Sequence, residues 1–361
     1  MKTKTFDVYL FIAVIILVIF GIIMIYSSSN IWAIYKYNDA LKYVKAQSLF
    51  LLVGIIIMII ISKIPYLNYY YKANLILAIC FLLLLLVLIP SIGTVRNGAR
   101  SWFGIGSFGI QPSEFAKLGL VIFTAKYLAK NDYILGRVAK GIWPIFLITL
   151  LIFLLIMLQP DFGTGMVIVL SIVALFFVAG VNFKFFIHIG ILGVLAVIGL
   201  IMGAPYRLLR IISFLDPWRD PLGSGFQIIQ SLFAIGPGGL LGFGFGHSIQ
   251  KHFYLPEPQT DFIFSIISEE FGFMGILIVS FFFLTILIRS INIALRTNNR
   301  FAKYLVFGII FQIIFQTILN LMVVVGLVPV TGITLPLLSY GGSSLLISLI
   351  GIGIILNVSR Y

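Results

Sequence analysis

An acid stands at the start of an apolar segment in LPEPQTDFIFSIISEEFGF, residues 255–273. A run rich in Pro and Gly ends at Pro258, and Asp261 follows just before the apolar residues begin. The chain contains only 11 Asp and Glu residues, so each can be weighed individually. A carboxylate at such a boundary is a candidate for function, and it could equally cap the following helix, as could Thr260.

Polar residues continue along one face of this segment. In a helix that begins near Asp261, Ser265, Ser268 and Glu269 lie within a quarter turn of the acid, whereas Glu270 points to the opposite side. At 1.5 Å per residue the stripe is about 12 Å long. Polar groups at membrane depth must face the protein interior or a cavity. We therefore expect Glu269 to line a cavity or an ion pair, and Glu270 to have a structural partner.

Two more motifs place charges next to helix starts. In QPSEFAK (111–117), Glu114 and Lys117 are one turn apart and can pair directly. We expect a structural ion pair that also shapes a cavity. In QPDFGT (159–164), Asp161 lies in a typical turn sequence, which favours a helix cap. A second acid of an outer cavity, for a ligand or for a divalent cation such as Mg or Mn, is the alternative.

The composition indicates a polytopic membrane protein. The chain has 361 residues, of which 61% are hydrophobic and 10% charged, whereas soluble domains average about 25% charged. One cysteine and three histidines exclude a disulfide framework and argue against a Cys or His metal centre. The net charge of +13 is explained by cytoplasmic Lys and Arg, so it does not predict a nucleic-acid partner.

Apolar runs predict an all-α fold of about ten transmembrane helices in a single domain, 1–361. The first run lacks a signal-peptide cleavage site, so we interpret it as a retained helix. The expected helices are 6–28, 47–62, 73–90, 112–129, 142–159, 163–181, 184–203, 261–288, 303–326 and 335–357.

The distribution of basic residues predicts both termini in the cytoplasm. With the N-terminus inside, the short outside loops hold only Lys36, Lys42, Lys45, Arg96 and Arg100. The inside segments hold Lys2, Lys4, Lys63, Lys72, Lys126, Lys130, Arg137, Lys140, Lys184, Arg289, Arg296, Arg300, Lys303 and Arg360. The longest hydrophilic segment, 204–260, then becomes a large extracellular loop between the seventh and eighth helices.

Basic residues in the outer loops could bind an anionic ligand, although ordinary surface ion pairs are the favoured explanation. The long loop contributes Arg207, Arg210, Arg219 and Lys251, and the loop at 91–111 contributes Arg100. Trp102 beside Arg100 is typical of a membrane interface or, alternatively, of a sugar-stacking surface. The glycine-rich stretch 236–246 follows no βαβ pattern, so a surface or re-entrant loop is favoured over a nucleotide site.

Side-chain spacing predicts packing in the last two helices. Gln312, Gln316 and Asn320 recur at i, i+4 and i+8, which favours interhelical hydrogen bonds. The small residues of LSYGGSSLL (338–346) favour close helix contact.

Four sequence blocks in order resemble the SEDS family (shape, elongation, division and sporulation), the FtsW/RodA/SpoVE group. They are NGARSWFGIGSFGIQPSEFAK, QPDFGT, YLPEPQTDFIFSIISEEFG and VTGITLPLLSYGGSSLL, and together they span about residues 97–346. Thr334 in GITLP and the ending LNVSRY are more similar to the FtsW/SpoVE branch than to RodA. The choice among division, sporulation and elongation roles stays open.

The resemblance implies a peptidoglycan glycosyltransferase that polymerises lipid II at the outer face of a bacterial cytoplasmic membrane. It implies that Asp261 is the essential acid, that Trp102 is an important outer aromatic residue, and that Glu114 and Lys117 form a family ion pair. A class B penicillin-binding protein, other divisome or sporulation proteins and membrane lipids are the implied partners. No cofactor is certain, and Mg or Mn stays open.

Two other functions fit the same residues. A lipid II flippase would use the polar stripe as a headgroup path, with Asp261 as a binding residue. A non-catalytic scaffold of a cell-wall synthase would need none of the acids. For the glycosyltransferase, Asp261 would be the general base of an inverting transfer, and the outer cations would stabilise the pyrophosphate leaving group.

Overall fold

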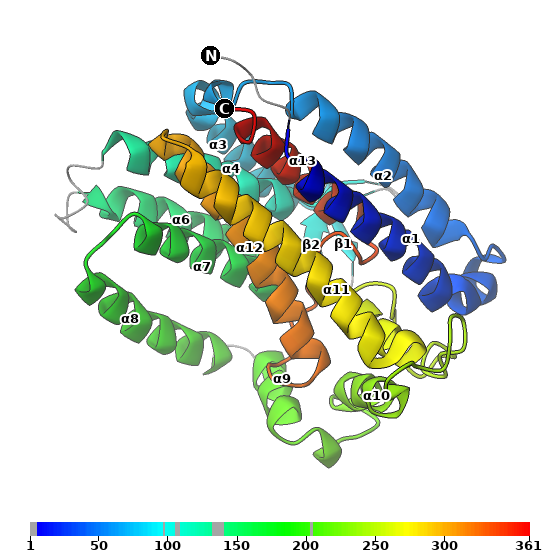
Figure 1. The fold of residues 1–361 in the computed structure, drawn as a ribbon. Coiled ribbons are helices and arrows are strands. Elements are labelled where there is room, and N and C mark those ends of the chain that lie inside the picture. Colours follow the sequence, from blue (N-terminus) through cyan, green and yellow to red (C-terminus); the bar gives the residue numbers. More distant parts are fainter. Residues whose placement is uncertain (1–5, 97, 105–108, 132–140, 203–204) are drawn as a thin grey trace.

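The computed structural model describes residues 6–96, 98–104, 109–131, 141–202 and 205–361. Helices run side by side through its length, and both chain ends lie at the same end of the bundle (Figure 1). Each of the ten predicted apolar segments coincides with a helix, namely α1 (Val8–Tyr37), α2 (Lys42–Ile61), α3 (Leu67–Leu88), α4 (Pro112–Lys130), α6 (Trp143–Met157), α7 (Phe162–Val178), α8 (Phe183–Met202), α11 (Ile263–Arg296), α12 (Arg300–Val324) and α13 (Gly342–Val358).

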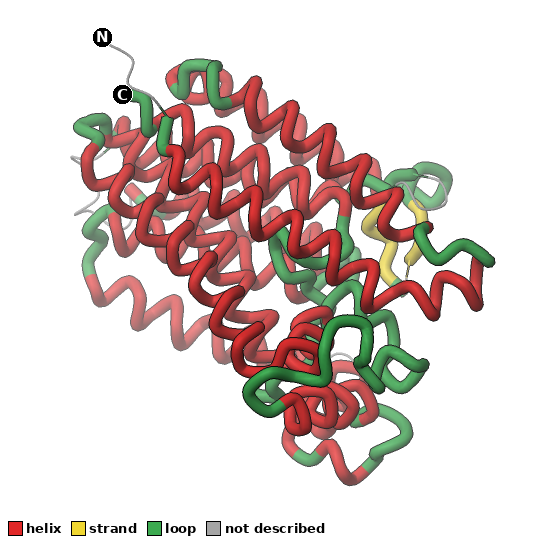
Figure 2. Tube along the Cα trace, turned by 45° about the vertical axis from the view of Figure 1, so that its right-hand side comes forward, coloured by secondary structure: helices red, strands yellow, loops and turns green. Residues whose placement is uncertain are grey.

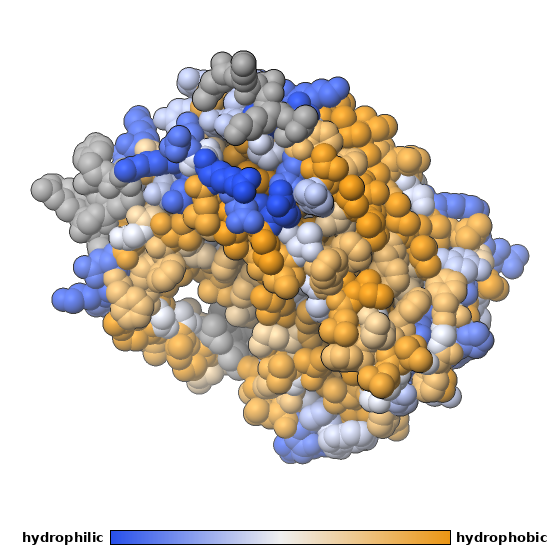
Figure 3. Space-filling view, in the orientation of Figure 1, coloured by the Kyte–Doolittle hydropathy of each residue, from blue (hydrophilic) through white to orange (hydrophobic). Residues whose placement is uncertain are grey.

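The outer surface of the bundle matches a membrane environment. Apolar side chains cover much of the face formed by α1 and α11, and hydrophilic residues gather toward the ends of the molecule (Figure 3). Among the described helices, five are long and apolar enough to cross a bilayer: α1, α2, α3, α11 and α12. Several of the remaining helices are apolar but shorter. The protein is therefore a helical membrane protein, and the number of spans stays a prediction.

α12 is the centre of the bundle. It packs against α4, α7, α11 and α13, and most of its side chains are buried. A Cβ atom on Gly308 would lie 2.5 Å from Val121 Cγ1, so this glycine permits the close approach of α12 to α4. Lipid chains are as apolar as Leu, so helices in a bilayer associate through such close packing and through polar contacts.

Three features differ from the predicted all-helical pattern. The outer segment 94–102 forms a small antiparallel hairpin of β1 (Thr94–Arg96) and β2 (Ala99–Trp102), coloured yellow in Figure 2. The segment expected to be a plain outer loop contains α9 (Pro205–Leu215), η2 (Pro217–Arg219), α10 (Phe226–Ile235) and η3 (Gly236–Gly238). The last helix begins at Gly342, so the expected start at 335 is wrong.

The prediction of close contact around 338–346 is confirmed. A Cβ atom on Gly342 would lie 2.4 Å from the Phe50 ring of α2, and one on Gly21 of α1 would lie 2.9 Å from Leu338. Residues 335–338 are apolar because they are buried beneath these helices, even though they are not helical.

Candidate functional site

Asp261 lies at the mouth of α11, in the turn that precedes the helix. Its carboxylate is partly exposed, and the Thr260 hydroxyl donates to Oδ1 at 2.9 Å. α11 begins at Ile263 with Phe262 as its N-cap residue, and Phe262 makes no side-chain cap bond. Neither Asp261 nor Thr260 occupies the N-cap position, so the capping alternative is wrong and the carboxylate lies outside the helix.

The backbone at Asp261 is fixed by α12. Asn320 is 1% exposed, and its Nδ2 donates to the Asp261 carbonyl at 2.7 Å and to the Ile333 carbonyl at 2.8 Å. One turn earlier, Gln316 Nε2 donates to the Thr334 carbonyl at 2.9 Å. The polar face of α12 therefore ties Asp261 to the segment before α13. The predicted interhelical hydrogen bonds are made by Gln312 and Gln316, to Lys117 of α4, whereas Asn320 bonds to non-helical backbone.

The predicted ion pair of α4 is confirmed and joins the same network. Lys117 Nζ lies 2.9 Å from Glu114 Oε2, and both side chains are 6% exposed. Lys117 Nζ also donates to Gln316 Oε1 at 2.6 Å, while Gln312 Nε2 donates to the Lys117 carbonyl at 2.8 Å. The pair borders a cavity of about 20 Å³, which has room for about one water molecule.

Asp161 is the N-cap residue of α7, as its turn sequence predicts. Its Oδ1 accepts from the Thr164 N–H at 3.1 Å. Its Oδ2 accepts from Gln111 Nε2 at 2.9 Å and from the Ser113 hydroxyl at 3.4 Å. The carboxylate thus links the starts of α4 and α7. The alternative role as a second acid of an outer cavity gains no support from these contacts, which are all structural.

The pair Glu269 and Glu270 holds the loop 246–251 against α11. Both carboxylates are buried, and Glu269 accepts from the Ser248 hydroxyl and from the Ile249 N–H at 2.8 Å. Ser265 of the same face contacts the Ser231 hydroxyl of α10 at 2.8 Å. The polar stripe therefore faces protein, as expected. Glu269 makes hydrogen bonds to a loop, and it forms no ion pair among the described residues.

The structure corrects the expectation for Lys251. Its side chain is 2% exposed, and Nζ lies 3.1 Å from Glu270 Oε1. Nζ also donates to the Gly246 carbonyl at 2.6 Å and to the Ser27 hydroxyl at 3.3 Å. All three N–H groups are engaged in the interior. Lys251 is therefore the structural partner expected for Glu270, and its ammonium is not presented to an outer ligand.

Ser27 is a residue of this cluster that the sequence does not reveal. Its hydroxyl lies 2.6 and 2.8 Å from the two carboxylate oxygens of Glu270, which joins α1 to α11. The only signal is the polar run SSSN directly after an apolar run, which suggests a helix end. α1 instead continues to Tyr37, and Ser28 and Ser29 donate to the Met24 and Ile25 carbonyls.

The glycine-rich segment 236–246 fills a break in α11. At Gly272 the helix has φ 59° and ψ −151°, which interrupts the helical hydrogen bonds. The loop backbone replaces them, because the Phe243 and Gly244 N–H groups donate to the Glu269 and Glu270 carbonyls. The Phe273 and Met274 N–H groups donate in turn to the Gly239 and Leu240 carbonyls. Non-helical backbone at this depth is thus shielded by protein.

We expect Gly272→Ala to destabilise the protein by about 1–3 kcal/mol or more, because only glycine readily adopts this backbone conformation. The added Cβ would also lie 2.5 Å from the Gly242 nitrogen. Thermal unfolding of purified protein measures the effect. Gly236→Ala is the matched control, since a Cβ there meets nothing within 4 Å. Equal unfolding temperatures for the two variants would contradict the proposed fit of loop and helix.

The outer hairpin carries Trp102 and Arg100, both partly buried on β2. The Arg96 guanidinium lies 5.0 Å from the centroid of the Trp102 ring, so a cation covers one ring face. Arg100 packs beside Gly93, where a Cβ atom would lie 3.1 Å from Arg100 Cγ. A sugar could stack only on the other face of Trp102.

The remaining outer cations lie in the segment after α8. Arg219 ends η2, is exposed, and lies close to α10, which in turn packs against α11. Arg207 and Arg210 belong to α9, and their side chains lie outside the described part of the structure. In the described residues no group of three or more His, Cys, Asp or Glu side chains is arranged to hold a metal ion. A role for Mg or Mn stays a prediction.

The motif blocks that are far apart in the chain therefore meet at one end of the bundle. The block at 111–117 contacts α7 through Asp161 and contacts α13 through Ser343, whose hydroxyl accepts from the Gln111 N–H at 3.1 Å. The α12 amides connect the same block to Asp261 and to residues 333–334. This arrangement places the partly exposed Asp261 above a buried polar network, with the partly exposed Asp161 held in that network by its contacts to α4 and α7.

Comparisons with known proteins agree over nearly the whole chain. Residues 7–361 match the FTSW_RODA_SPOVE family of cell cycle proteins. Stage V sporulation protein E of Bacillus subtilis (strain 168) is 50% identical over 360 residues, covering 100% of this chain and 98% of that protein. A probable peptidoglycan glycosyltransferase FtsW of Geobacter sp. (strain M18) is 38% identical, covering 99% of this chain and 98% of that protein.

Solved structures agree as well. A chain of a structure described as "Structural coordination of polymerization and crosslinking by a peptidoglycan synthase complex" has a TM-score of 0.79 and 31% identity, covering 98% of each chain. The crystal structure of the rod shape determining protein RodA of Thermus thermophilus has a TM-score of 0.71 and 30% identity, covering 99% of this chain and 98% of that one. The chain therefore belongs to the FtsW/RodA/SpoVE family.

Proposed function

We propose that this protein is a peptidoglycan glycosyltransferase that polymerises lipid II into glycan strands during cell division or sporulation. The observation that carries the proposal is the position of Asp261. Its carboxylate is partly exposed at the mouth of α11, while α12 fixes the backbone behind it. A general base needs this combination of access to substrate and a fixed position. The similarity to FtsW and stage V sporulation protein E points to the same reaction.

In the proposed reaction Asp261 takes the proton from the 4-hydroxyl of the acceptor GlcNAc. The hydroxyl oxygen attacks the anomeric carbon of the donor, and the bond from that carbon to the pyrophosphate oxygen breaks. The electron pair leaves with the polyprenyl pyrophosphate. We expect a single displacement with inversion, because the carboxylates of Asp161, Glu269 and Glu270 are engaged in structural contacts elsewhere and are not available as a nucleophile.

The leaving pyrophosphate needs cations to stabilise its growing charge. Arg219 is the exposed candidate among the described residues of the long outer segment, and Arg100 is the candidate on the hairpin. Arg207 and Arg210 stay candidates from the sequence. Lys251 is no longer one, because its ammonium is buried against Glu270.

We further propose that the protein lies in the cytoplasmic membrane of a bacterium with both termini inside and Asp261 outside. Basic side chains support this orientation, because Lys126, Arg289 and Arg360 lie at the end of the bundle that carries the termini. We propose a class B penicillin-binding protein as a partner, since one structural neighbour belongs to a complex that couples polymerization to crosslinking.

The experiment that tests the function supplies the purified protein with labelled lipid II, with and without a class B penicillin-binding protein. Glycan polymer that depends on this chain is the expected product. A parallel assay in vesicles follows lipid II movement across the bilayer. Lipid movement with no polymer in any condition would replace the proposed enzyme by a flippase. If the penicillin-binding protein made glycan polymer at the same rate without this chain, the chain would be a scaffold.

A further inference from the structure

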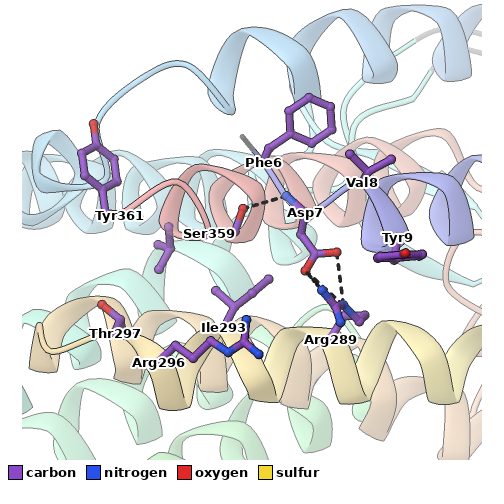
Figure 4. Close-up of a pocket in the computed structure, with 11 residues that line it drawn as sticks. Phe6, Asp7, Val8, Tyr9, Arg289, Ile293, Arg296, Thr297, Ser359 and Tyr361 are labelled. Atoms are coloured by element: carbon purple, nitrogen blue, oxygen red, sulfur yellow. Dashed lines mark hydrogen bonds and ion pairs between the residues drawn. The ribbon is translucent and has the colours of Figure 1, made fainter. Parts of the chain in front are cut away.

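A cavity of about 530 Å³ opens at the end of the bundle that carries both termini. This volume lies within the range of small-ligand pockets, about 300–1,000 Å³. The start of α1, the last turns of α11 and the residues after α13 form its walls (Figure 4). It lies far along the bundle from Asp261, because α11 begins beside Asp261 and reaches the cavity only at Arg289.

Two arginines on one face of α11 supply the charge. Arg289 and Arg296 are seven residues apart, so they lie on the same face about 10 Å from each other along the axis. Ile293 lies between them and is buried. Figure 4 shows the Arg296 side chain running along the helix toward Arg289. The cavity thus has a guanidinium on each side of an apolar floor.

The ion pair with Asp7 uses only part of Arg289. The Nε and Nη2 groups of Arg289 donate to the Asp7 carboxylate, and the carboxylate also caps α1 through the Leu10 N–H. Guanidinium has five N–H donors, so donors on Arg289 stay available. Arg296 is exposed and has no ion-pair or hydrogen-bond partner among the described residues. The charge of the lining side chains is therefore positive, with two arginines against one aspartate.

The surroundings of the cavity are apolar on the sides that face lipid. Tyr9, Ile12 and Ile16 form an exposed stripe on α1, with 42–70% of each side chain accessible. Arg289 lies 5.2 Å from the Tyr9 ring centroid, so this stripe begins at the cavity. The exposed Ile278 and Phe281 continue the apolar surface on the neighbouring α11. A ligand with a phosphate and two hydrocarbon chains fits both parts of this surface.

We propose that this cavity binds the headgroup of an anionic phospholipid from the leaflet at the termini. The phosphate diester accepts from Arg296 and from the free donors of Arg289. The acyl chains lie along the apolar stripes of α1 and α11. Guanidinium forms short, charge-assisted bonds to phosphate oxygens, which a zwitterionic lipid satisfies less well because its own ammonium competes for them.

Native mass spectrometry of the full chain in detergent tests the proposal with two probes, dioleoyl phosphatidylglycerol and dioleoyl phosphatidylcholine. Single lipids in micelles create no bilayer surface potential, so general attraction of anionic lipid to basic residues does not enter. We expect tighter binding of phosphatidylglycerol. Arg296→Gln should weaken it about tenfold, the effect of losing a charge-assisted hydrogen bond. Arg296→Lys should retain part of the affinity. Arg289 is left intact, because its removal would strand Asp7.

Lys63→Gln is the matched control. Lys63 is exposed and lies at the same end of the bundle, because the neighbouring Ser62 carbonyl accepts from Asn357 near the end of α13. Lys63 does not line the cavity. The Lys63→Gln variant should therefore bind phosphatidylglycerol like the unchanged protein. Equal binding of the two lipids, or equal affinities of Arg296→Gln and Lys63→Gln, would overturn the proposal. Displacement of the lipid by equimolar glycerol 1-phosphate would replace it by a site for a soluble phosphate.

Discussion

Replacing Asp261 by Asn should lower the rate of glycan polymerisation by about 10²–10⁴-fold, the usual contribution of a general base. Asn has the same shape but cannot take the proton of the acceptor hydroxyl. The supporting contacts survive the change, because Asn320 donates to the main-chain carbonyl of residue 261 and the Thr260 hydroxyl can donate to the amide oxygen. The variant should therefore fold normally.

Labelled lipid II and gel separation of the glycan products measure this effect. Asp216→Asn is the matched control, since Asp216 is an exposed acid of the same outer segment and should leave the rate unchanged. Unfolding temperatures of both variants should equal that of the unchanged protein. Normal polymerisation by Asp261→Asn would show that Asp261 is not the catalytic base. Lost polymerisation with unchanged lipid II binding would support the catalytic role of Asp261.

The ten helical segments could be predicted because a bilayer imposes both length and apolar composition. Helix ends were less predictable where buried apolar residues lie outside a helix or polar residues lie inside one. Leu335 and Leu338 are apolar because they pack in the core, although they precede α13. Conversely, Ser27 is polar yet lies inside α1, because Glu270 provides a partner for its hydroxyl. Composition records the environment of a residue more faithfully than its backbone conformation.

Contacts within one helical turn were also predictable, whereas contacts made through a loop were not. Glu114 and Lys117 pair because their spacing places them together. Asp161 caps α7 because the turn sequence permits it. Lys251 meets Glu270 only because residues 236–251 fold back across the break at Gly272. The sequence shows the glycines but not the helix carbonyls that their backbone binds.

The buried pair of α4 leads to the second large effect. Lys117→Met should destabilise the protein by about 3–5 kcal/mol, because it leaves the Glu114 carboxylate charged and without its cation in the interior. The Gln316 Oε1 atom loses its donor as well. The double variant Glu114→Gln, Lys117→Met removes both charges, so it should recover a substantial part of the loss. Unfolding of purified protein by titration with a denaturing detergent measures all three free energies.

The ion pair of Lys45 with Asp39 is the matched control, because it has the same N–O distance as the α4 pair but lies on the surface. Both pairs have N–O distances of 2.9 Å, but the side chains of Lys45 and Asp39 are 65% and 40% exposed. Lys45→Met should change stability little, because water screens an exposed pair and solvates the remaining carboxylate. If Lys117→Met and Lys45→Met cost the same, the α4 pair would be solvated in the native protein. A double variant as unstable as Lys117→Met would instead show that the ammonium matters through its bond to Gln316, which links α4 to α12 below Asp261.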